Sequence, residues 1–308
     1  MTYDLIIVGG GPAGAAAGVY AARKKIKTLI ITADKSGQSV VSPEIQNWIG
    51  EIKIGGEELS KKLWQHVEAY ASDILTIKPS TKVIKTEKTE AGFLLTTESG
   101  ETLEAKSVLI TTGGRRRRLE VPGAAEFDQK GLTYCASCDG PMFTDKDVVV
   151  IGGGNAGLES AAQLLAYAKT VFLIHRHQEF KGDQITVEKL LKNPKFHAIL
   201  NAEPVEVKGD KFVTSLVYRD LDSDELKDLP VSGIFIEIGF LPNTEMVKDL
   251  VTLTSTGAII TDAKNQRASV AGVWAAGDCT DGLYHQNNIA AGDAVKAVED
   301  IYQWLHKN

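Results

Sequence analysis

The stretch LIIVGGGPAG, residues 5–14, determines how the N-terminal part of the chain folds. Its first four residues are apolar and mostly β-branched, which is typical of a parallel strand buried on both faces. Glycines in the pattern G-x-G-x-x-G follow at Gly9, Gly11 and Gly14. They permit a tight turn, close approach of the backbone to a pyrophosphate and close helix packing. With an alanine-rich helix over 13–24 and a strand over 28–31, they predict a βαβ unit that binds a dinucleotide.

The same pattern of apolar residues and glycines recurs as VVVIGGGNAG at residues 148–157, with its glycines at Gly152, Gly154 and Gly157. A helix and a strand over 171–174 are predicted to follow it, so the chain contains a second nucleotide-binding unit. The segment 273–278 and an apolar-periodic helix over 289–305 have no nucleotide loop of their own, and we expect them to complete the first domain. The predicted fold is α/β, with two Rossmann-like (three-layer ββα) domains, the second inserted into the first. The first comprises residues 1–114 and 243–308, and the second residues 115–242.

Length and composition agree with this organisation. The chain has 308 residues, about twice a typical ~150-residue domain. Hydrophobic residues make up 43% and charged residues 24%, the balance of a soluble globular protein. The net charge of −6 gives no electrostatic reason to expect nucleic acid or an anionic membrane as partner. No signal peptide opens the sequence and no apolar run approaches the ~20 residues of a membrane span, so we expect a cytoplasmic protein.

Cys135 and Cys138 form a C-x-x-C pair immediately before the second nucleotide-binding unit. Such a pair suits dithiol–disulfide exchange, in which one cysteine attacks and the other resolves. Zinc would need two further ligands at comparable spacing, which the sequence does not offer, so we expect no metal; two inert buried thiols are the other alternative. The carboxyl group of Asp139 is a candidate general acid or an ordinary turn residue.

Basic residues follow the second strand of the second βαβ unit, where an NAD site usually carries an acidic residue. His175, Arg176 and Lys181 therefore favour the 2′-phosphate of NADPH, with a solvated basic turn as the alternative. Elsewhere, Asp34 is either a ribose ligand or a turn residue, and Cys279 is expected to fill the core. The run Arg115 to Arg118 predicts a solvated linker, or a docking site for an acidic partner or a dinucleotide phosphate.

Several motifs resemble, in the same order along the whole chain, those of low-molecular-weight thioredoxin reductases. They are GGGPAG, TTGG after a strand, YCASCDGP, VVVIGGGNAG, EIGFLPNT and AAGDCTD. The region from LNAEPVEVKGD to GFLPNT is also similar to the reductase portion of the alkyl hydroperoxide reductase flavoprotein subunit, which shares this fold.

The resemblance implies FAD in the first domain, and NAD(P)H and a redox-active disulfide in the second. Carried over by position, the FAD contacts are Gly9, Gly11, Pro12, Ala13, Gly14, Gln38, Asn47, Gly113, Asp278, Gln286 and Asn287. The corresponding NAD(P)H contacts are Gly152, Gly154, Asn155, Ala156, Gly157, His175, Arg176 and Lys181. It also makes Cys138 the flavin-proximal sulfur and Cys135 the exchanging one.

Two features depart from the family pattern. His177 and Lys181 replace arginines that read the phosphate, so the preference for NADPH is expected to be weaker and NADH remains possible. The usual Gly-Gly-Gln near the flavin reads Ser36-Gly37-Gln38, a change that we expect the fold to absorb.

The resemblance leads us to expect an enzyme, a homodimeric thioredoxin-disulfide reductase. Electrons would pass from NAD(P)H through FAD and the Cys135–Cys138 disulfide to a thioredoxin-like protein or another small redoxin. One alternative is a stand-alone reductase that feeds a peroxiredoxin system through a separate redoxin. Another is a redox sensor that binds nucleotides without turnover. A ferredoxin-type flavin reductase would need no C-x-x-C pair, which argues against it.

Overall fold

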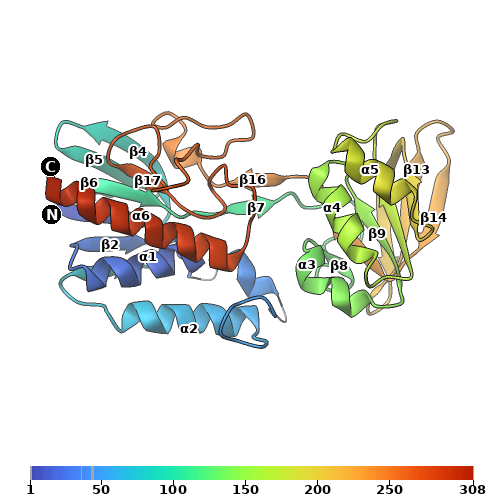
Figure 1. Ribbon diagram of the computed structural model, residues 1–308, viewed down its shortest axis with the longest axis horizontal. Helices are drawn as coiled ribbons and strands as arrows, with labels where there is room; N and C mark the ends of the chain where they lie inside the picture. Colours follow the sequence, from blue (N-terminus) through green and yellow to red (C-terminus); the bar gives the residue numbers. More distant parts are fainter. Residues whose placement is uncertain (1, 36, 43–44, 308) are drawn as a thin grey trace. The chain divides into compact units, whose positions relative to one another are not determined.

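The computed structural model describes residues 2–35, 37–42 and 45–307. The chain divides into two compact units. Unit 1 contains Met1–Arg115 and Leu241–Asn308, and unit 2 contains Arg116–Phe240. The chain passes between them at β7 (Gly114–Arg116) and β16 (Phe240–Pro242), which pair as a two-stranded ladder. Figure 1 labels the helices and strands of both units.

A seven-stranded sheet forms the centre of unit 1, in the order β3-β2-β1-β6-β5-β4, with β17 also paired to β6. The strands are β1 (Thr2–Val8), β2 (Thr28–Ile31), β3 (Leu75–Lys78), β4 (Val83–Thr89), β5 (Gly92–Thr97), β6 (Thr102–Ile110) and β17 (Val273–Ala275). Strand β1 pairs in parallel with β2 and β6, whereas β4, β5 and β6 form an antiparallel meander. Residues 5–8 of β1 and 108–110 of β6 are apolar and buried because both faces of the sheet are covered there.

Three helices accompany this sheet: α1 (Pro12–Arg23), α2 (Gly56–Glu68) and α6 (Asn287–Lys307). A 3₁₀ turn, η1, covers Gln38–Val41, and another, η3, covers Glu245–Val247. Helices α1 and α6 pack together against one face of the sheet (Figure 1). Small residues permit this approach: a Cβ built on Gly18 would lie 2.4 Å from the Ile30 side chain. Strand β17 and α6 thus return the C-terminal segment to the unit that begins the chain.

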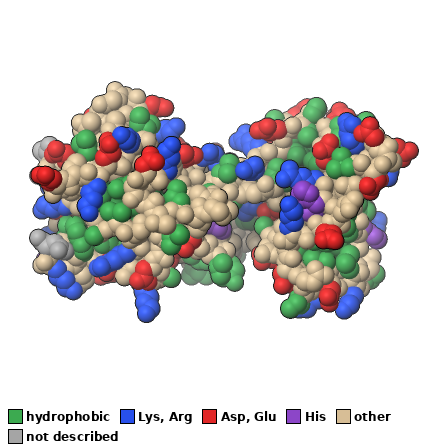
Figure 2. Space-filling view, turned by 90° about the horizontal axis from the view of Figure 1, so that it is seen from above, with side chains coloured by type: hydrophobic (Ala, Val, Ile, Leu, Met, Phe, Trp, Pro, Cys, Tyr) green, Lys and Arg blue, Asp and Glu red, His purple; other side chains and the backbone are tan. Residues whose placement is uncertain are grey.

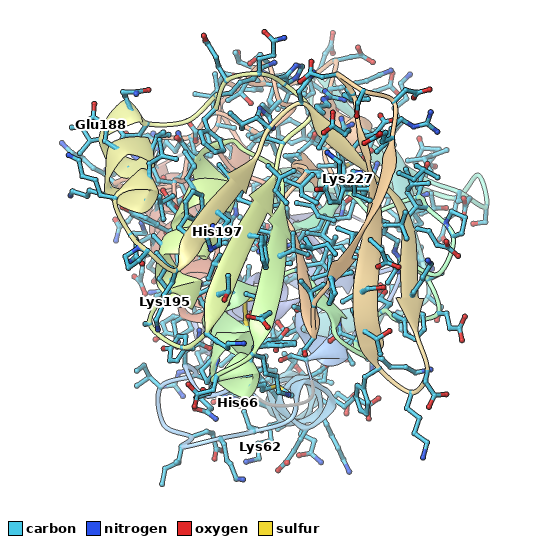
Figure 3. The ribbon with its side chains drawn as sticks, turned by 90° about the vertical axis from the view of Figure 1, so that its right-hand side faces the viewer. Lys62, His66, Glu188, Lys195, His197 and Lys227 are labelled. Carbon is cyan, nitrogen blue, oxygen red and sulfur yellow. A yellow bond between two sulfur atoms is a disulfide. The ribbon has the colours of Figure 1, made fainter. Side chains whose placement is uncertain are left out.

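Unit 2 is centred on a five-stranded parallel sheet in the order β11-β10-β9-β15-β8. Its strands are β8 (Leu132–Thr133), β9 (Asp147–Ile151), β10 (Thr170–Ile174), β11 (Phe196–Ile199) and β15 (Gly233–Ile236). An antiparallel sheet adds β12 (Ala202–Gly209), β13 (Val213–Asp220) and β14 (Leu226–Pro230). Figure 3 shows both sheets, with His197 on β11 and Lys227 on β14.

The helical segments of unit 2 are α3 (Ala136–Asp139), η2 (Gly140–Phe143), α4 (Asn155–Leu164) and α5 (Gln184–Leu191). Apolar side chains of α4 and α5 cover one face of the parallel sheet, and the antiparallel sheet contributes to the core on its other face. Asp183 caps the N-terminus of α5, because its carboxylate accepts the backbone N–H of Thr186 at 2.8 Å. Strand β9 with α4 therefore repeats in unit 2 the arrangement of β1 with α1.

Within residues 2–35, 37–42 and 45–307, no helix has the length and apolarity that crossing a bilayer requires.

Candidate active site

The two cysteines of the C-x-x-C pair form a disulfide at the start of α3. Strand β8 ends at Thr133, and Cys135 is the residue that caps the short helix. The backbone N–H of Cys138 points at the Cys135 sulfur at 3.2 Å. Both cysteines are partly exposed. An N–H group directed at a sulfur favours its thiolate form, so this geometry suits thiol–disulfide exchange.

Asp139 is a buried carboxyl group one residue beyond the disulfide, 8% exposed. The Thr133 hydroxyl donates a hydrogen bond to its Oδ2. Burial raises the pKa of Asp139 above the ordinary value, and the Thr133 hydrogen bond opposes that rise. A carboxyl group that keeps its proton to higher pH beside a disulfide can act as a general acid. The sequence suggests Asp139 itself, but not Thr133, because a threonine that ends a strand has no distinctive sequence signal.

The first glycine motif forms the tight turn between β1 and α1. A Cβ built on Gly9 would lie 2.2 Å from the carbonyl oxygen of Thr111, and one on Gly14 would lie 2.0 Å from the Gly9 oxygen. By contrast, a Cβ on Gly11 would meet no atom within 4 Å. Gly9 and Gly14 therefore serve backbone packing, whereas Gly11 borders open space at the N-terminus of α1. The first-turn N–H groups and the helix dipole make that space suitable for a pyrophosphate.

Hydrogen bonds gather the other candidate FAD residues of unit 1 around this helix terminus. Asn47 donates to the Gln286 side chain at 2.9 Å, and Gln38 donates to the carbonyl of Gly114, next to Gly113. Ser39 donates to Asn287 at 2.7 Å.

The segment after β17 joins this group through Gly277, which precedes Asp278. A Cβ built on Gly277 would lie 3.4 Å from Ala13 of α1 and 3.0 Å from Ala290 of α6. Asp278 also lies 3.5 Å from His285, the residue before Gln286. Residues from four distant segments thus meet near the first glycine loop.

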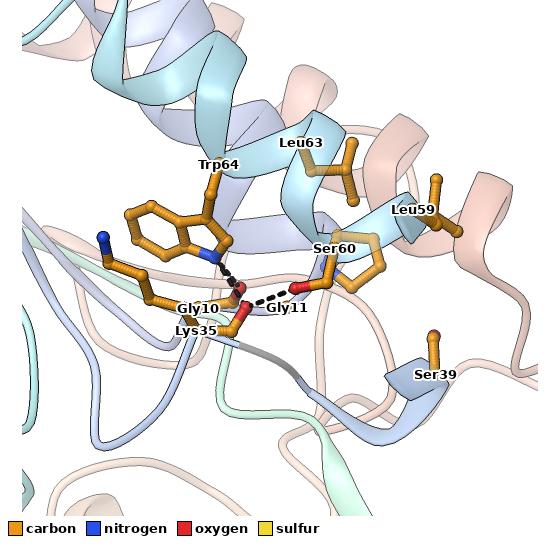
Figure 4. Close-up of a pocket in the computed structure, with 9 residues that line it drawn as sticks. Gly10, Gly11, Lys35, Ser39, Leu59, Ser60, Leu63 and Trp64 are labelled. Atoms are coloured by element: carbon orange, nitrogen blue, oxygen red, sulfur yellow. Dashed lines mark hydrogen bonds between the residues drawn. The ribbon is translucent and has the colours of Figure 1, made fainter. Parts of the chain in front are cut away.

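A small pocket adjoins the first glycine loop (Figure 4). It is lined by Gly10, Gly11, Pro12, Lys35, Ser39, Leu59, Ser60, Leu63 and Trp64. The Trp64 indole N–H is within hydrogen-bonding distance of two carbonyl oxygens, Gly10 at 3.0 Å and Lys35 at 2.6 Å. Trp64 therefore ties α2 to both the glycine loop and the segment after β2. The amphipathic pattern of α2 predicts a buried face, but not that its tryptophan supports the glycine loop.

The second glycine motif reproduces the first in unit 2. A Cβ on Gly157 would lie 1.9 Å from the Gly152 oxygen, whereas one on Gly154 would meet no atom within 4 Å. The open space at Gly154 again lies at the N-terminus of a helix, α4. The segment before α5 folds over this loop, because Lys181 donates its backbone N–H to Gly153 at 2.9 Å. Asp183 likewise donates its N–H to the Asn155 side chain at 2.7 Å.

The basic residues after β10 lie together beside this loop, since His177, Lys181 and Arg176 all influence His175. Figure 2 shows His side chains next to Lys or Arg side chains on the surface of unit 2. His175 is 8% exposed, and its Nδ1 accepts the Gly153 N–H at 3.2 Å. Burial, with smaller contributions from His177 and Lys181, lowers the pKa of His175. His175 is therefore a neutral support beneath the loop, whereas the exposed Arg176 guanidinium is available to a ligand.

Glu237, which sequence inspection does not single out, lies where the strand order of unit 2 reverses. It follows β15, and its backbone oxygen would lie 2.1 Å from a Cβ on Gly152. Its carboxylate accepts the Ser160 hydroxyl at 2.7 Å and pairs with Arg116 at 3.0 Å. Burial raises the pKa of Glu237, and Arg116 opposes the rise. Ligands of doubly wound folds bind at this point of strand reversal, so Glu237 connects the expected nucleotide site to β7.

The run of four arginines is only partly a solvated linker. Arg115 contacts Asn243 at 2.6 Å and Glu245 at 3.1 Å, and Arg116 pairs with Glu237, whereas Arg117 and Arg118 are exposed. The exposed Asp34 accepts the N–H of Gly37, as a turn residue does.

Cys279 belongs to an apolar core cluster of unit 1. Cys279 is fully buried, as expected of a core residue, and burial raises its pKa to about 11. Ser36 lies outside the described residues. Among the residues that are described, no three His, Cys, Asp or Glu side chains converge as a metal site.

Comparisons with known proteins agree with this architecture. A family model for pyridine nucleotide-disulphide oxidoreductases matches residues 3–294. Thioredoxin reductase from Streptococcus pyogenes MGAS5005 superimposes with a TM-score of 0.91 at 33% identity, covering 100% of this chain and 99% of that one. Thioredoxin reductase from Giardia duodenalis gives 0.92 at 32% identity, with 99% of each chain covered. The predicted fold class, with two Rossmann-like nucleotide-binding domains, is thereby confirmed.

Among curated proteins, an alkyl hydroperoxide reductase subunit of Escherichia coli is 40% identical over 304 residues, covering 98% of this chain and 58% of that protein. A Bacillus subtilis protein named NADH dehydrogenase is 37% identical over 306 residues, covering 99% of this chain and 59% of that protein. The chain thus spans less than two thirds of the length of these relatives. Together with the paired glycine loops and the disulfide, these matches show that the chain belongs to the pyridine nucleotide-disulphide oxidoreductases, with a thioredoxin reductase-like fold.

Proposed function

We propose that the protein is an NAD(P)H-dependent flavin disulfide reductase that reduces the disulfide of a thioredoxin-like protein or another small redoxin. The observation that carries this proposal is the Cys135–Cys138 disulfide beside the buried carboxyl of Asp139, in the unit that contains the second glycine loop. Family membership implies a flavin and a nicotinamide cofactor. When bound, the flavin would carry electrons from the nicotinamide to this disulfide.

The cofactor assignment follows from the two glycine loops. Unit 1 would hold FAD through the loop at Gly11 and the group of Gln38, Asn47, Asp278, Gln286 and Asn287. Unit 2 would hold the nicotinamide dinucleotide through the loop at Gly154. We assign NADPH as the preferred donor because Arg176 can meet a 2′-phosphate with paired charge-assisted hydrogen bonds.

The chemistry of the cysteine pair then follows standard thiol–disulfide exchange. In the reduced enzyme the Cys135 thiolate attacks the partner disulfide, which forms a mixed disulfide and expels one partner thiolate. The Cys138 thiolate attacks the Cys135 sulfur, re-forms the intramolecular disulfide and expels the second partner thiolate. Two electrons and two protons reach the partner, and Asp139 is placed to supply one of the protons.

The substitutions Cys135→Ser and Cys138→Ser test this proposal. Each should abolish reduction of a redoxin disulfide, because exchange requires both sulfurs, while FAD stays bound through unit 1. Serine substitution of Cys279, which is buried, serves as the control and should retain turnover. Initial rates with NADPH and NADH, measured against a panel of purified redoxins, would identify the donor and the partner. Substantial turnover by either single mutant would contradict the proposed function.

The relatives named as alkyl hydroperoxide reductase subunits favour a second candidate. In it the protein would feed a peroxiredoxin system through a separate redoxin. The same panel distinguishes the two: peroxide-dependent NAD(P)H oxidation in the presence of a peroxiredoxin and its redoxin would support the second candidate.

A further inference from the structure

The Thr133 side chain contacts both ends of α3, at the capping residue Cys135 and at the candidate acid Asp139. It is the last residue of β8 and is 4% exposed. Strand β8 pairs with β15, with Thr133 opposite Phe235, so the threonine is fixed by the parallel sheet. Its hydroxyl donates to Asp139 Oδ2 and accepts the backbone N–H of Cys135 at 3.4 Å.

The directions of these two hydrogen bonds follow from the single proton of a hydroxyl group. Because Cys135 N–H can only donate, the Thr133 proton is free to point at Asp139. A hydroxyl that accepts one hydrogen bond donates the next one more strongly. Since Oδ2 accepts this hydrogen bond, Oδ1 is the oxygen of Asp139 that can carry a proton for exchange.

We propose that Thr133 is a positioning residue that fixes the Asp139 carboxyl relative to the cysteine pair and sets its strength as a proton donor. This inference rests on the proposed function, because it requires Asp139 to act in disulfide exchange. In that step, Cys135 Sγ forms a bond to one sulfur of the attacked disulfide while the bond between its two sulfurs breaks. The departing sulfur takes the electron pair of the broken bond as a thiolate, and Asp139 Oδ1 gives it a proton. Thr133 keeps its own proton throughout.

The surroundings of Asp139 make the effect of one hydroxyl measurable. The pKa of Asp139 responds to burial and to Thr133, and no charged side chain of the described residues contributes a resolved influence. On the adjoining elements, Ser137 of α3 donates to Gln163 of α4, a Cβ built on Gly140 would lie 3.4 Å from the Tyr167 ring, and Glu159 is the acidic residue of α4. Tyr134 is the neighbouring phenol, and burial raises its pKa. Asp128 and Arg118 influence the same Tyr134, and Cys135 and Cys138 become titratable once they are reduced.

The test uses full-length, FAD-loaded enzyme reduced with dithiothreitol and then freed of it. Its single-turnover reaction with oxidised glutathione is followed across pH, because the glutathione thiolate is basic enough to require a proton. Asp139→Asn identifies the limb of the pH profile that depends on the carboxyl group. Thr133→Val removes the hydroxyl at nearly constant volume, and Thr133→Ser restores it. Flavin absorbance and disulfide content verify that each variant is folded.

We expect the Asp139-dependent limb to lie about one pH unit higher in Thr133→Val, because the ionised carboxylate loses a donor. Thr133→Ser should match the wild type. The inference is overturned if Thr133→Val leaves the limb in place, if both Thr133 variants move it equally, or if Asp139→Asn removes no limb. NAD(P)H-driven reduction of a redoxin is measured in parallel. Intact turnover without the expected shift would refute the role of Thr133 and leave the proposed function standing.

Discussion

Asp139 carries a carboxyl group whose environment favours proton donation at the expense of stability. Burial raises its pKa in the folded protein above the unfolded value, so folding disfavours the carboxylate. This group therefore lowers the free energy of unfolding as pH rises from the unfolded pKa through the folded pKa, and the loss persists above it. One pH unit of difference corresponds to about 1.4 kcal/mol.

Asp139→Asn should consequently raise the free energy of unfolding at neutral pH while it slows disulfide exchange. This difference in the free energy of unfolding should vanish at a pH below both the folded and the unfolded pKa of Asp139, where the aspartic acid is neutral. Denaturant unfolding of the oxidised protein at several pH values measures this difference. A variant that is less stable than the wild type at neutral pH would contradict the assigned direction.

Arg176 is the side chain on which cofactor choice should depend. It is exposed beside the second glycine loop, whereas His175 is buried and burial lowers its pKa. Arg176→Ala should raise the KM for NADPH about ten- to a hundredfold, because a charge-assisted contact is worth roughly 1.5–3 kcal/mol. The KM for NADH should change little.

Lys192→Ala, which removes an exposed charge at the end of α5, is the control for Arg176→Ala. Equal losses for NADPH and NADH would show that Arg176 does not read the phosphate. A wild-type enzyme that prefers NADH would disprove the NADPH assignment and favour the alkyl hydroperoxide reductase-like candidate.

At the level of elements, the two strand–loop–helix units give matched tests of the cofactor sites. Built Cβ atoms on Gly11 and Gly154 meet open space, so alanine at either position should leave the fold intact. The added methyl group would occupy the space where a pyrophosphate approaches the backbone. Gly11→Ala should weaken FAD retention, and Gly154→Ala should raise the Kd for NADPH, each by tenfold or more.

Absorbance of the retained flavin and calorimetric titration with NADP⁺ measure these two effects. Gly9→Ala is the contrasting variant, because its Cβ would lie 2.2 Å from Thr111 O at a φ of +125°. It should destabilise unit 1 whether or not FAD is present. If Gly154→Ala binds NADP⁺ as tightly as the wild type, the second loop is not the nicotinamide site.

The elements also show which features the sequence can predict. The two βαβ units are recognisable because their buried strands, glycine turns and small-residue helices are all local signals. The break after β15 is not predicted: β15 ends at Ile236, and Gly239 adopts a φ of +120°. Helix α5 is not predicted, since it is short and its cap at Asp183 is a single residue.

The sequence predicts those site residues that stand in motifs, but it does not predict those that act through tertiary contacts. The cysteines and glycines stand in recognisable spacings. Thr133, Trp64 and Glu237 act through partners far away in sequence or through burial, and a single sequence shows neither. Glu237, for example, pairs with Arg116, which lies 121 positions earlier in the chain.

For the whole molecule, the division into two compact units predicts that the two cofactors stabilise different parts of the chain. A ligand at a hundred times its Kd stabilises the state that binds it by about 2.7 kcal/mol. Saturating NADP⁺ should therefore slow hydrogen exchange in β9 and α4, whereas removal of FAD should speed it in β1 and α1. Gly154→Ala should abolish the protection of β9 and α4 by NADP⁺ and leave the effect of FAD removal on β1 and α1 unchanged. Protection by NADP⁺ confined to α1 would reverse the cofactor assignment.

The burial of Cys279 has a practical consequence for following the redox state of this protein. The chain contains three cysteines, and the third has no exposed surface and a pKa of about 11. Native alkylation with iodoacetamide should therefore leave the oxidised protein unlabelled and add two groups to the reduced one. Intact-mass spectrometry of briefly labelled, unfractionated protein would then count the reduced molecules directly, without a spectroscopic probe or an engineered thiol.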